Sequence, residues 1–343
     1  MYIENKKLNY YLIYWLSLMF FIIAVMIVVG GLTRLTDSGL SITKWQLFTG
    51  ILPPLSENQW IEYFELYKEI PEYKLQNYNM TINEFKVIFW WEFAHRFLGR
   101  LIGIFYLLPL IFFFIKLGFN KTKNLFFIFF LICLQGFIGW DMVSSGLIDR
   151  VDVSHYRLSL HLVLAFIILS LILWNYLIFK NVKKSTLKIQ YYLPNFFLVL
   201  IFIQICIGAF VSGMDAGKIY NSWPLMGLSY YPDDSSLNDL ISFSVFNEPS
   251  LVQFIHRNLA YVILFFYLII LYNVYKNKLF IFFNTIKLIG FFLFLQVVLG
   301  IFTILSGAQI VISSMHQISS IFLVSSTIYL IYLNSNSNLQ PSS

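Results

Sequence analysis

The sequence FAHRFL at residues 93–98 recurs as FIHRNL at residues 254–259. The first copy lies inside the apolar run 87–115, and the second lies inside the apolar run 251–273. Ionisable side chains are costly inside an apolar membrane segment, so a repeated His-Arg pair there indicates a duplicated functional position. The repeat therefore predicts a chain built from two related halves.

Apolar runs long enough to cross a bilayer, about 20 residues each, occur eight times along the chain. They lie at 11–32, 87–115, 124–145, 156–179, 192–213, 251–273, 280–305 and 310–333. The composition agrees, because 12% of the residues are charged, against about a quarter in soluble domains. We predict an all-α integral membrane protein with eight transmembrane helices.

Lysines are concentrated in the loops at 116–123, 180–191 and 274–279, which carry no acidic residue. The positive-inside rule places these loops, and with them both termini, on the cytoplasmic side. The long connections at 33–86 and 214–250 then lie on the opposite, outer side. The net charge of +6 reflects the loop lysines, and we expect no nucleic-acid partner.

Two further segments lie outside the spans. Residues 58–67 in the first long connection have apolar side chains at helical spacing, which predicts an amphipathic helix on the membrane surface. The last ten residues, 334–343, are polar, and we expect them to form a short disordered tail.

The halves 1–188 and 189–343 match along their lengths. Each has His-Arg on its second span, a Gln-x-x-x-Gly motif on its third span and another histidine on its fourth. The third-span motifs run from Gln135 to Gly139 and from Gln296 to Gly300, and the fifth span adds Gln204 to Gly208. Since four spans return the chain to its starting side, the halves are parallel repeats. We predict two tandem, pseudo-symmetric four-helix bundles as the two domains.

Four of the five histidines lie near the outer ends of even-numbered spans, namely His95, His161, His256 and His316. Within each half the two histidines can face each other, and facing imidazoles are what six-coordinate haem iron requires. Zinc competes, although structural zinc takes four ligands at one site, and a proton relay is another role for membrane histidines. We interpret the four as two haem-ligand pairs. The fifth, His155, lies in a short outer loop, and we expect it to be solvated.

Arginines near the histidines are candidates for binding haem propionates, because a guanidinium forms bidentate pairs with carboxylates. The alternative is that they extend to the membrane interface. The candidates are Arg34, Arg96, Arg100, Arg157 and Arg257.

The halves differ three residues before the His-Arg pair. Glu92 precedes His95, whereas Gln253 precedes His256. Residues at i and i+3 share a helix face, so each side chain is expected to face its own pocket. A buried carboxylate is costly unless it is paired or functional. We predict that Glu92 is catalytic, and the alternative is an ion pair with Arg96.

Longer motifs accompany these residues. They are GGLTRLTDSGLS at 30–41, Trp45 with Pro53 and Pro54, EFAHR at 92–96, GWDMVSSGL at 139–147, NSWPLM at 221–226 and FIHR at 254–257. With them, the chain resembles haem A synthase over nearly its whole length, in the type found in alpha-proteobacteria and mitochondria. It lacks the pair of loop cysteines that other members of the family carry.

The resemblance implies an oxidoreductase of the bacterial inner membrane, which oxidises the C8 methyl group of haem O to a formyl group by two successive hydroxylations for cytochrome oxidase assembly. It places haem O at His95 and His161 and the iron of a haem b cofactor at His256 and His316, towards the periplasmic side. It gives Glu92 the catalytic role. The lipid bilayer and a haem O-making farnesyltransferase are the expected partners, while the electron acceptor or donor and the oxygen source stay open.

Two other functions stay open from the residues alone. A membrane dihaem b-type electron-transfer cytochrome would hold two identical haems, and Glu92→Gln would leave its activity intact. A transporter is favoured by the repeat, although a transporter site usually lies near the midplane on broken helices.

Overall fold

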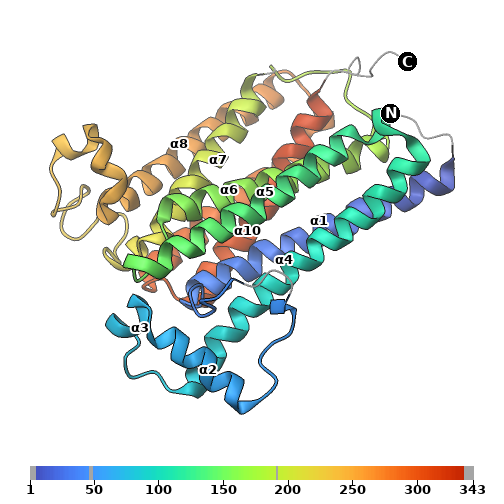
Figure 1. Cartoon of the computed structure of the whole chain (residues 1–343). Coiled ribbons are helices and arrows are strands. Elements are labelled where there is room, and N and C mark those ends of the chain that lie inside the picture. Colours follow the sequence, from blue (N-terminus) through green and yellow to red (C-terminus); the bar gives the residue numbers. More distant parts are fainter. Residues whose placement is uncertain (1–4, 46–48, 191, 336–343) are drawn as a thin grey trace.

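The computed structural model describes residues 5–45, 49–190 and 192–335 (Figure 1). Within this part of the chain eight helices are long and apolar enough to cross a membrane, and there is no β-strand. The eight are α1 (Lys6–Leu35), α4 (Ile82–Leu117), α5 (Phe119–Asp149), α6 (His155–Phe179), α7 (Tyr192–Gly213), α8 (Pro249–Lys276), α9 (Phe283–Leu305) and α10 (Ile310–Asn334). The predicted fold class and the number of spans are confirmed.

Shorter helices lie in the connections. The first long connection contains η1 (Thr49–Ile51), α2 (Glu57–Lys68) and α3 (Pro71–Leu75). Later connections contain η2 (Ala216–Lys218), η3 (Leu237–Ile241), η4 (Phe243–Asn247) and η5 (Phe280–Phe282). Helix α2 confirms the predicted amphipathic helix, while its place on a membrane surface stays a prediction. Figure 1 shows both long connections at one end of the helix array and the described ends of α1 and α10 at the other.

Local chemistry sets the ends of α4. At its start Thr81 and Glu84 form a capping box, in which the Glu84 carboxylate accepts a hydrogen bond from the Thr81 main-chain N–H at 2.7 Å. At its end Gly118 is the one residue between α4 and α5, with φ +77°. Glycine adopts this left-handed conformation without steric penalty. The chain therefore reverses direction between two long helices over a single residue.

The helices of each half pack in a ring. In the first half α1 packs on α4, α4 on α5, α5 on α6 and α6 on α1, and helices α7 to α10 repeat this arrangement. The halves meet where α6 contacts α7 and α10 and where α1 contacts α10. One apolar core runs through both halves, from Leu12 to Leu333. The division into domains 1–188 and 189–343 stays a prediction, as does the side of the membrane that the termini face.

The expectation of a disordered tail from Asn334 was wrong for its first residue. Asn334 is the last residue of α10 and is buried, and its side chain pairs with the main chain of Ile189 in both directions, at 2.8 and 3.1 Å. A polar residue was expected to be solvated here, but the loop before α7 supplies it with main-chain partners. Residues 336–343 lie outside the described residues.

Candidate functional site

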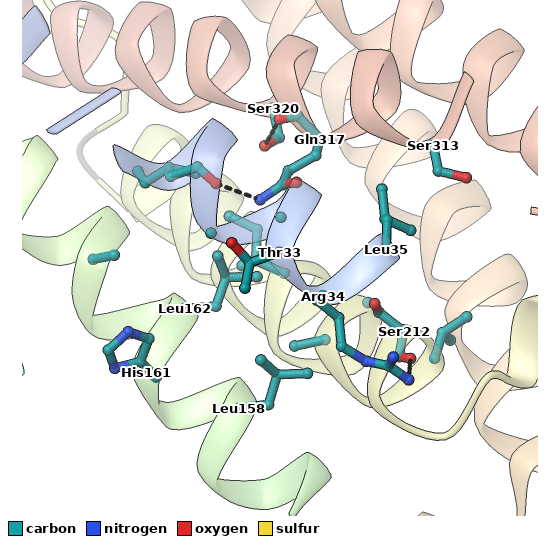
Figure 2. A pocket seen from close by; sticks show the side chains of 18 of the residues that line it. Thr33, Arg34, Leu35, Leu158, His161, Leu162, Ser212, Ser313, Gln317 and Ser320 are labelled. Atoms are coloured by element: carbon teal, nitrogen blue, oxygen red, sulfur yellow. Dashed lines mark hydrogen bonds between the residues drawn. The ribbon is translucent and has the colours of Figure 1, made fainter. Parts of the chain in front are cut away.

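One cavity among the helices, with a volume of about 970 Å³, has all four span histidines in its wall. It reaches from the first ring of helices to the second past the C-terminal end of α1. Figure 2 shows Thr33 and Arg34 of α1 in this region, with His161 of α6 on one side and Gln317 of α10 on the other. The histidines predicted from the sequence are therefore brought to one connected space.

The histidine pair of the first half has a spacing that suits a shared metal ion. The ring centroids of His95 and His161 lie 6.4 Å apart, with 60° between the ring planes. Imidazoles that bind one ion from opposite sides have centroids roughly 6 to 6.5 Å apart, since each metal–nitrogen bond is about 2 Å. His256 and His316 line the same cavity in the second half.

The set of donor atoms favours a metal that brings other ligands with it. In the described ranges no three His, Cys, Asp or Glu residues gather in a way that could hold a metal ion. A structural zinc ion takes four protein ligands, whereas the iron of a haem needs only axial ligands from the protein. A pair of imidazoles beside a large apolar cavity therefore fits haem.

Each of the four imidazoles packs against a glycine of the long helix before it in the sequence. A Cβ atom added to that glycine would lie 2.9 to 3.2 Å from the nearest ring atom. The glycines are Gly30 for His95, Gly139 for His161, Gly208 for His256 and Gly300 for His316. A methyl group would displace the ring, so these positions make room for it. The structure thus repeats a pair of helices four times, within the twofold repeat read from the sequence.

Three of these glycines belong to the Gln-x-x-x-Gly motifs, and the glutamine of each motif holds the main chain of the same histidine. Its Nε2 donates to the histidine carbonyl oxygen. The bonds run from Gln135 to His161 at 2.9 Å, from Gln204 to His256 at 3.0 Å and from Gln296 to His316 at 2.9 Å. The motif was visible in the sequence, but this function of its glutamine was not.

Glu92 lines the cavity, is buried and is fully paired. One carboxylate oxygen accepts hydrogen bonds from the Ser41 hydroxyl and the Ile42 main-chain N–H, both at 2.7 Å. The other accepts from the guanidinium of Arg96, at 2.9 Å from its Nε and more closely from Nη2. The ion pair with Arg96, weighed as the alternative to catalysis, is present.

Gln253 takes the equivalent position in the second half. Its Nε2 donates to the carbonyl oxygen of Ala216 at 2.9 Å, and its Oε1 accepts from Arg257 at 3.0 Å. The loop after α1 presents donors to Glu92, whereas the loop after α7 presents an acceptor to Gln253. The Glu/Gln difference therefore has a structural cause, and a catalytic role for Glu92 stays a proposal.

The structure brings four of the five candidate arginines to the cavity wall. They are Arg34, Arg96, Arg100 and Arg257. Arg257 also donates to main-chain carbonyls of the second long connection, at 2.9 Å for Tyr220 and 3.0 Å for Ser222. Arg157 is not among the described residues that line the cavity. It pairs with Asp141 at 2.7 Å and is about 41% exposed.

Arg34 connects the ends of α1, α5 and α7 through its ion pairs and one hydrogen bond. Its guanidinium pairs with Asp37 at 2.5 Å, Asp215 at 3.4 Å and Asp152 at 3.6 Å. It also donates to the carbonyl oxygen of Ser212 at 2.9 Å, as Figure 2 shows. The three aspartates belong to connections that follow α1, α5 and α7, and Ser212 lies in the last turn of α7, so Arg34 links the two halves.

His155 is buried, so the expectation that it would be solvated was wrong. It is the first residue of α6, and its Cβ atom lies 2.8 Å from where a Cβ of Gly213 would be. Its ring also packs edge-on against Phe210, with centroids 5.3 Å apart. The loop ends one residue earlier than expected, so His155 belongs to the first turn of α6, which packs against Gly213 at the end of α7.

A second buried carboxylate at the cavity, Glu72 of α3, was missed in the sequence. Asn77 donates a long hydrogen bond to it at 3.5 Å. Burial raises the pKa of Glu72 to about 8, and the negative charge of Glu92 adds to the effect. Glu72 lies beyond the amphipathic stretch 58–67 of the first long connection, so no periodic pattern in the sequence marked it as buried.

Together these features define a multi-pass α-helical membrane protein with paired histidines around one large cavity. Residues 13–328 match the model of a family described as "Cytochrome oxidase assembly protein". The chain belongs to this family.

Several of its relatives are called heme A synthase. The relative from Pelagibacter ubique (strain HTCC1062) is 52% identical over 343 residues, which cover 98% of this chain and 100% of the relative. The one from Rickettsia bellii (strain RML369-C) is 43% identical over 337 residues, covering 94% and 98%. The one from Flavobacterium psychrophilum (strain ATCC 49511 / DSM 21280 / CIP 103535 / JIP02/86) is 39% identical over 335 residues, covering 95% and 98%.

Proposed function

We propose that this chain is a haem A synthase, an oxidoreductase that converts haem O to haem A. The reaction oxidises the C8 methyl group to a formyl group in two successive hydroxylations. The three relatives with this name described above match nearly the whole chain at 39% to 52% identity. The structural observation that carries the proposal is the imidazole pair of His95 and His161, 6.4 Å apart beside a cavity of about 970 Å³.

The two histidine pairs are assigned different roles. His95 and His161 would hold the substrate haem O, and His256 and His316 would hold the iron of a haem b cofactor. Bound iron supplies the redox chemistry. The assignment is supported by Glu92, since the first half alone places a carboxylate three residues before its His-Arg pair.

Glu92 would act on charge and protons beside the substrate. Arg96 balances the negative charge of the carboxylate while Ser41 and Ile42 fix its orientation. The Ser41 hydroxyl, 2.7 Å from Glu92 Oε2, is the donor that can rotate away, because the other donors are a main-chain amide and a charged guanidinium. Rotation would free one lone pair on Oε2, which could then accept a proton or stabilise positive charge on the substrate.

The arginines in the wall would bind propionates. Arg96 and Arg257 directly follow two of the ligand histidines, and Arg34 and Arg100 lie on the same cavity. A propionate is a carboxylate, for which the guanidinium fork is well suited. Arg157 would contribute only from the partly exposed outer end of α6.

We place the protein in the bacterial inner membrane, with its haem sites towards the periplasm. The lysine-rich loops support this orientation. A membrane farnesyltransferase that makes haem O would be the partner that supplies the substrate, and the product would serve the assembly of cytochrome oxidase.

Mass analysis of haem extracted from purified protein tests the proposal. Wild type should contain haem A or its hydroxylated precursor beside haem b, and Glu92→Ala should accumulate haem O without haem A. Gln253→Ala is the matched control and should still make haem A. If wild type held two haem b molecules and nothing else, the proposal would fail in favour of an electron-transfer cytochrome.

A further inference from the structure

The helical turns that carry the four histidines differ in the hydrogen bonds that their main chains accept. Three accept a side-chain hydrogen bond on the histidine carbonyl oxygen from the glutamine of a Gln-x-x-x-Gly motif. In α1 the residue four positions before Gly30 is Met26, which has no donor. Among the described residues no side chain donates to the carbonyl oxygen of His95. We call the hydrogen bond from a glutamine side chain to a histidine carbonyl oxygen a clamp. His95 packs against a glycine as the other three histidines do, but it lacks a clamp.

The ring of His95 also lies differently on its glycine. The other three imidazoles approach their glycines with Cε1, which would be 2.9 to 3.2 Å from an added Cβ, and with Nε2 farther away at 3.7 to 3.9 Å. His95 instead approaches Gly30 with Nε2, at 3.0 Å. Its ring is thus turned about the Cβ–Cγ bond relative to the others. His95, which has no clamp, is therefore also the histidine whose ring is oriented differently from the other three.

We infer that His95 is the exchangeable ligand of the substrate haem, the one that releases the iron when haem O enters and when the oxidised product leaves. The three clamped histidines stay in place. This inference rests on the proposed function, because it assumes that His95 and His161 share a haem that is replaced in every catalytic cycle.

The clamps are distributed as expected if one site retains its haem and the other releases it. A cofactor haem should stay bound, and both of its ligands, His256 and His316, are clamped. A substrate haem must be released, so one firm ligand and one loose ligand allow it to be held and then exchanged. His161 is the firm ligand on this assignment, with Gln135 as its positioning residue.

Carbon monoxide binding to the reduced, haem-loaded protein measures this difference, since the gas can bind iron only after an axial histidine has left. Wild type should bind carbon monoxide at one of its two haems. Met26→Gln supplies the missing clamp and should slow binding about fivefold, the change expected for one added neutral hydrogen bond. Met26→Leu, which adds no donor, is the control and should bind like wild type.

The reverse changes complete the test. Gln135→Met should speed binding at the first haem, and Gln296→Met should make the second haem reactive. If Met26→Gln and Met26→Leu bound carbon monoxide equally fast, or if both haems of wild type reacted alike, the inference would be overturned. Should Met26→Gln not load with haem, faster binding in Gln135→Met would support the inference and an unchanged rate would refute it. Failure of the proposed function would instead show as absence of haem O and haem A from the extracts.

Discussion

Replacing Glu92 by glutamine should destabilise the protein strongly, because it breaks a buried ion pair. The side chains of Glu92 and Arg96 are 3% and 10% exposed, so water screens them little. An amide could keep one oxygen towards Ser41 and Ile42, but its NH2 group would then face the guanidinium donors of Arg96. Removing one partner of a buried pair costs about 3–5 kcal/mol, because the remaining charge is left uncompensated. We expect the free energy of unfolding of Glu92→Gln to fall by about that amount.

Equilibrium unfolding in mixed detergent micelles measures this loss. A double-mutant cycle with Arg96→Met should recover part of it, because the double variant has no unpaired charge, with a coupling energy of about 2–3 kcal/mol. Gln253→Glu is the matched variant in the second half, and it should also destabilise, since it would turn a carboxylate oxygen towards the carbonyl oxygen of Ala216. The explanation of the Glu/Gln difference by the hydrogen-bonding groups of the two loops would be refuted by either of two results. One is a Glu92→Gln variant as stable as wild type, and the other is a double variant whose loss of stability equals the sum of the losses in Glu92→Gln and Arg96→Met.

Three further outcomes are expected. Burial raises the pKa of Glu72 to about 8. The stability that comes from keeping this carboxyl protonated is therefore fully present below about pH 4.5 and is lost as pH rises through 8. Glu72→Gln should remove this fall, a few kcal/mol, from the dependence of the unfolding free energy on pH. Gly139→Ala places a methyl group 2.9 Å from the His161 ring, so the haem absorbance per protein should fall towards that of one haem, whereas Gly136→Ala, with no atom within 4 Å of the added methyl, should keep both. Arg34→Gln should lower the free energy of unfolding by only about 1–2 kcal/mol, because the aspartate partners of Arg34 are partly exposed. The loss should be smaller in 1 M salt, which screens these ion pairs. A loss that did not change with salt would mean that Arg34 stabilises the protein by packing and not by charge.

The eight spans could be predicted from the sequence because apolar length is a local property. The closeness of His95 and His161 could also be predicted, since the parity of the spans puts both at the same end of the bundle, on helices that lie across the ring from each other. Both features depend on where residues lie along a helix. Neither requires knowledge of which group a side chain will meet.

The features that could not be predicted all depend on which group a side chain contacts in the folded protein. Gln135 was visible as part of a motif, but its acceptor is a main-chain carbonyl, which every residue has. The difference between Glu92 and Gln253 was visible, but the loops that meet them differ in main-chain orientation and not in an obvious motif. Glu72 lies in a connection whose course over the cavity is set by packing between α3 and α5.

Because each imidazole rests on a glycine of the span inserted just before its own, every ligand position can be completed as the chain leaves the ribosome. The α1–α4 and α5–α6 hairpins contain His95, His161 and the glycines on which they rest, all of which are translated before α7. Since N-terminal units mature first during synthesis, the first histidine pair should be able to come together in the bilayer while the second is still being made.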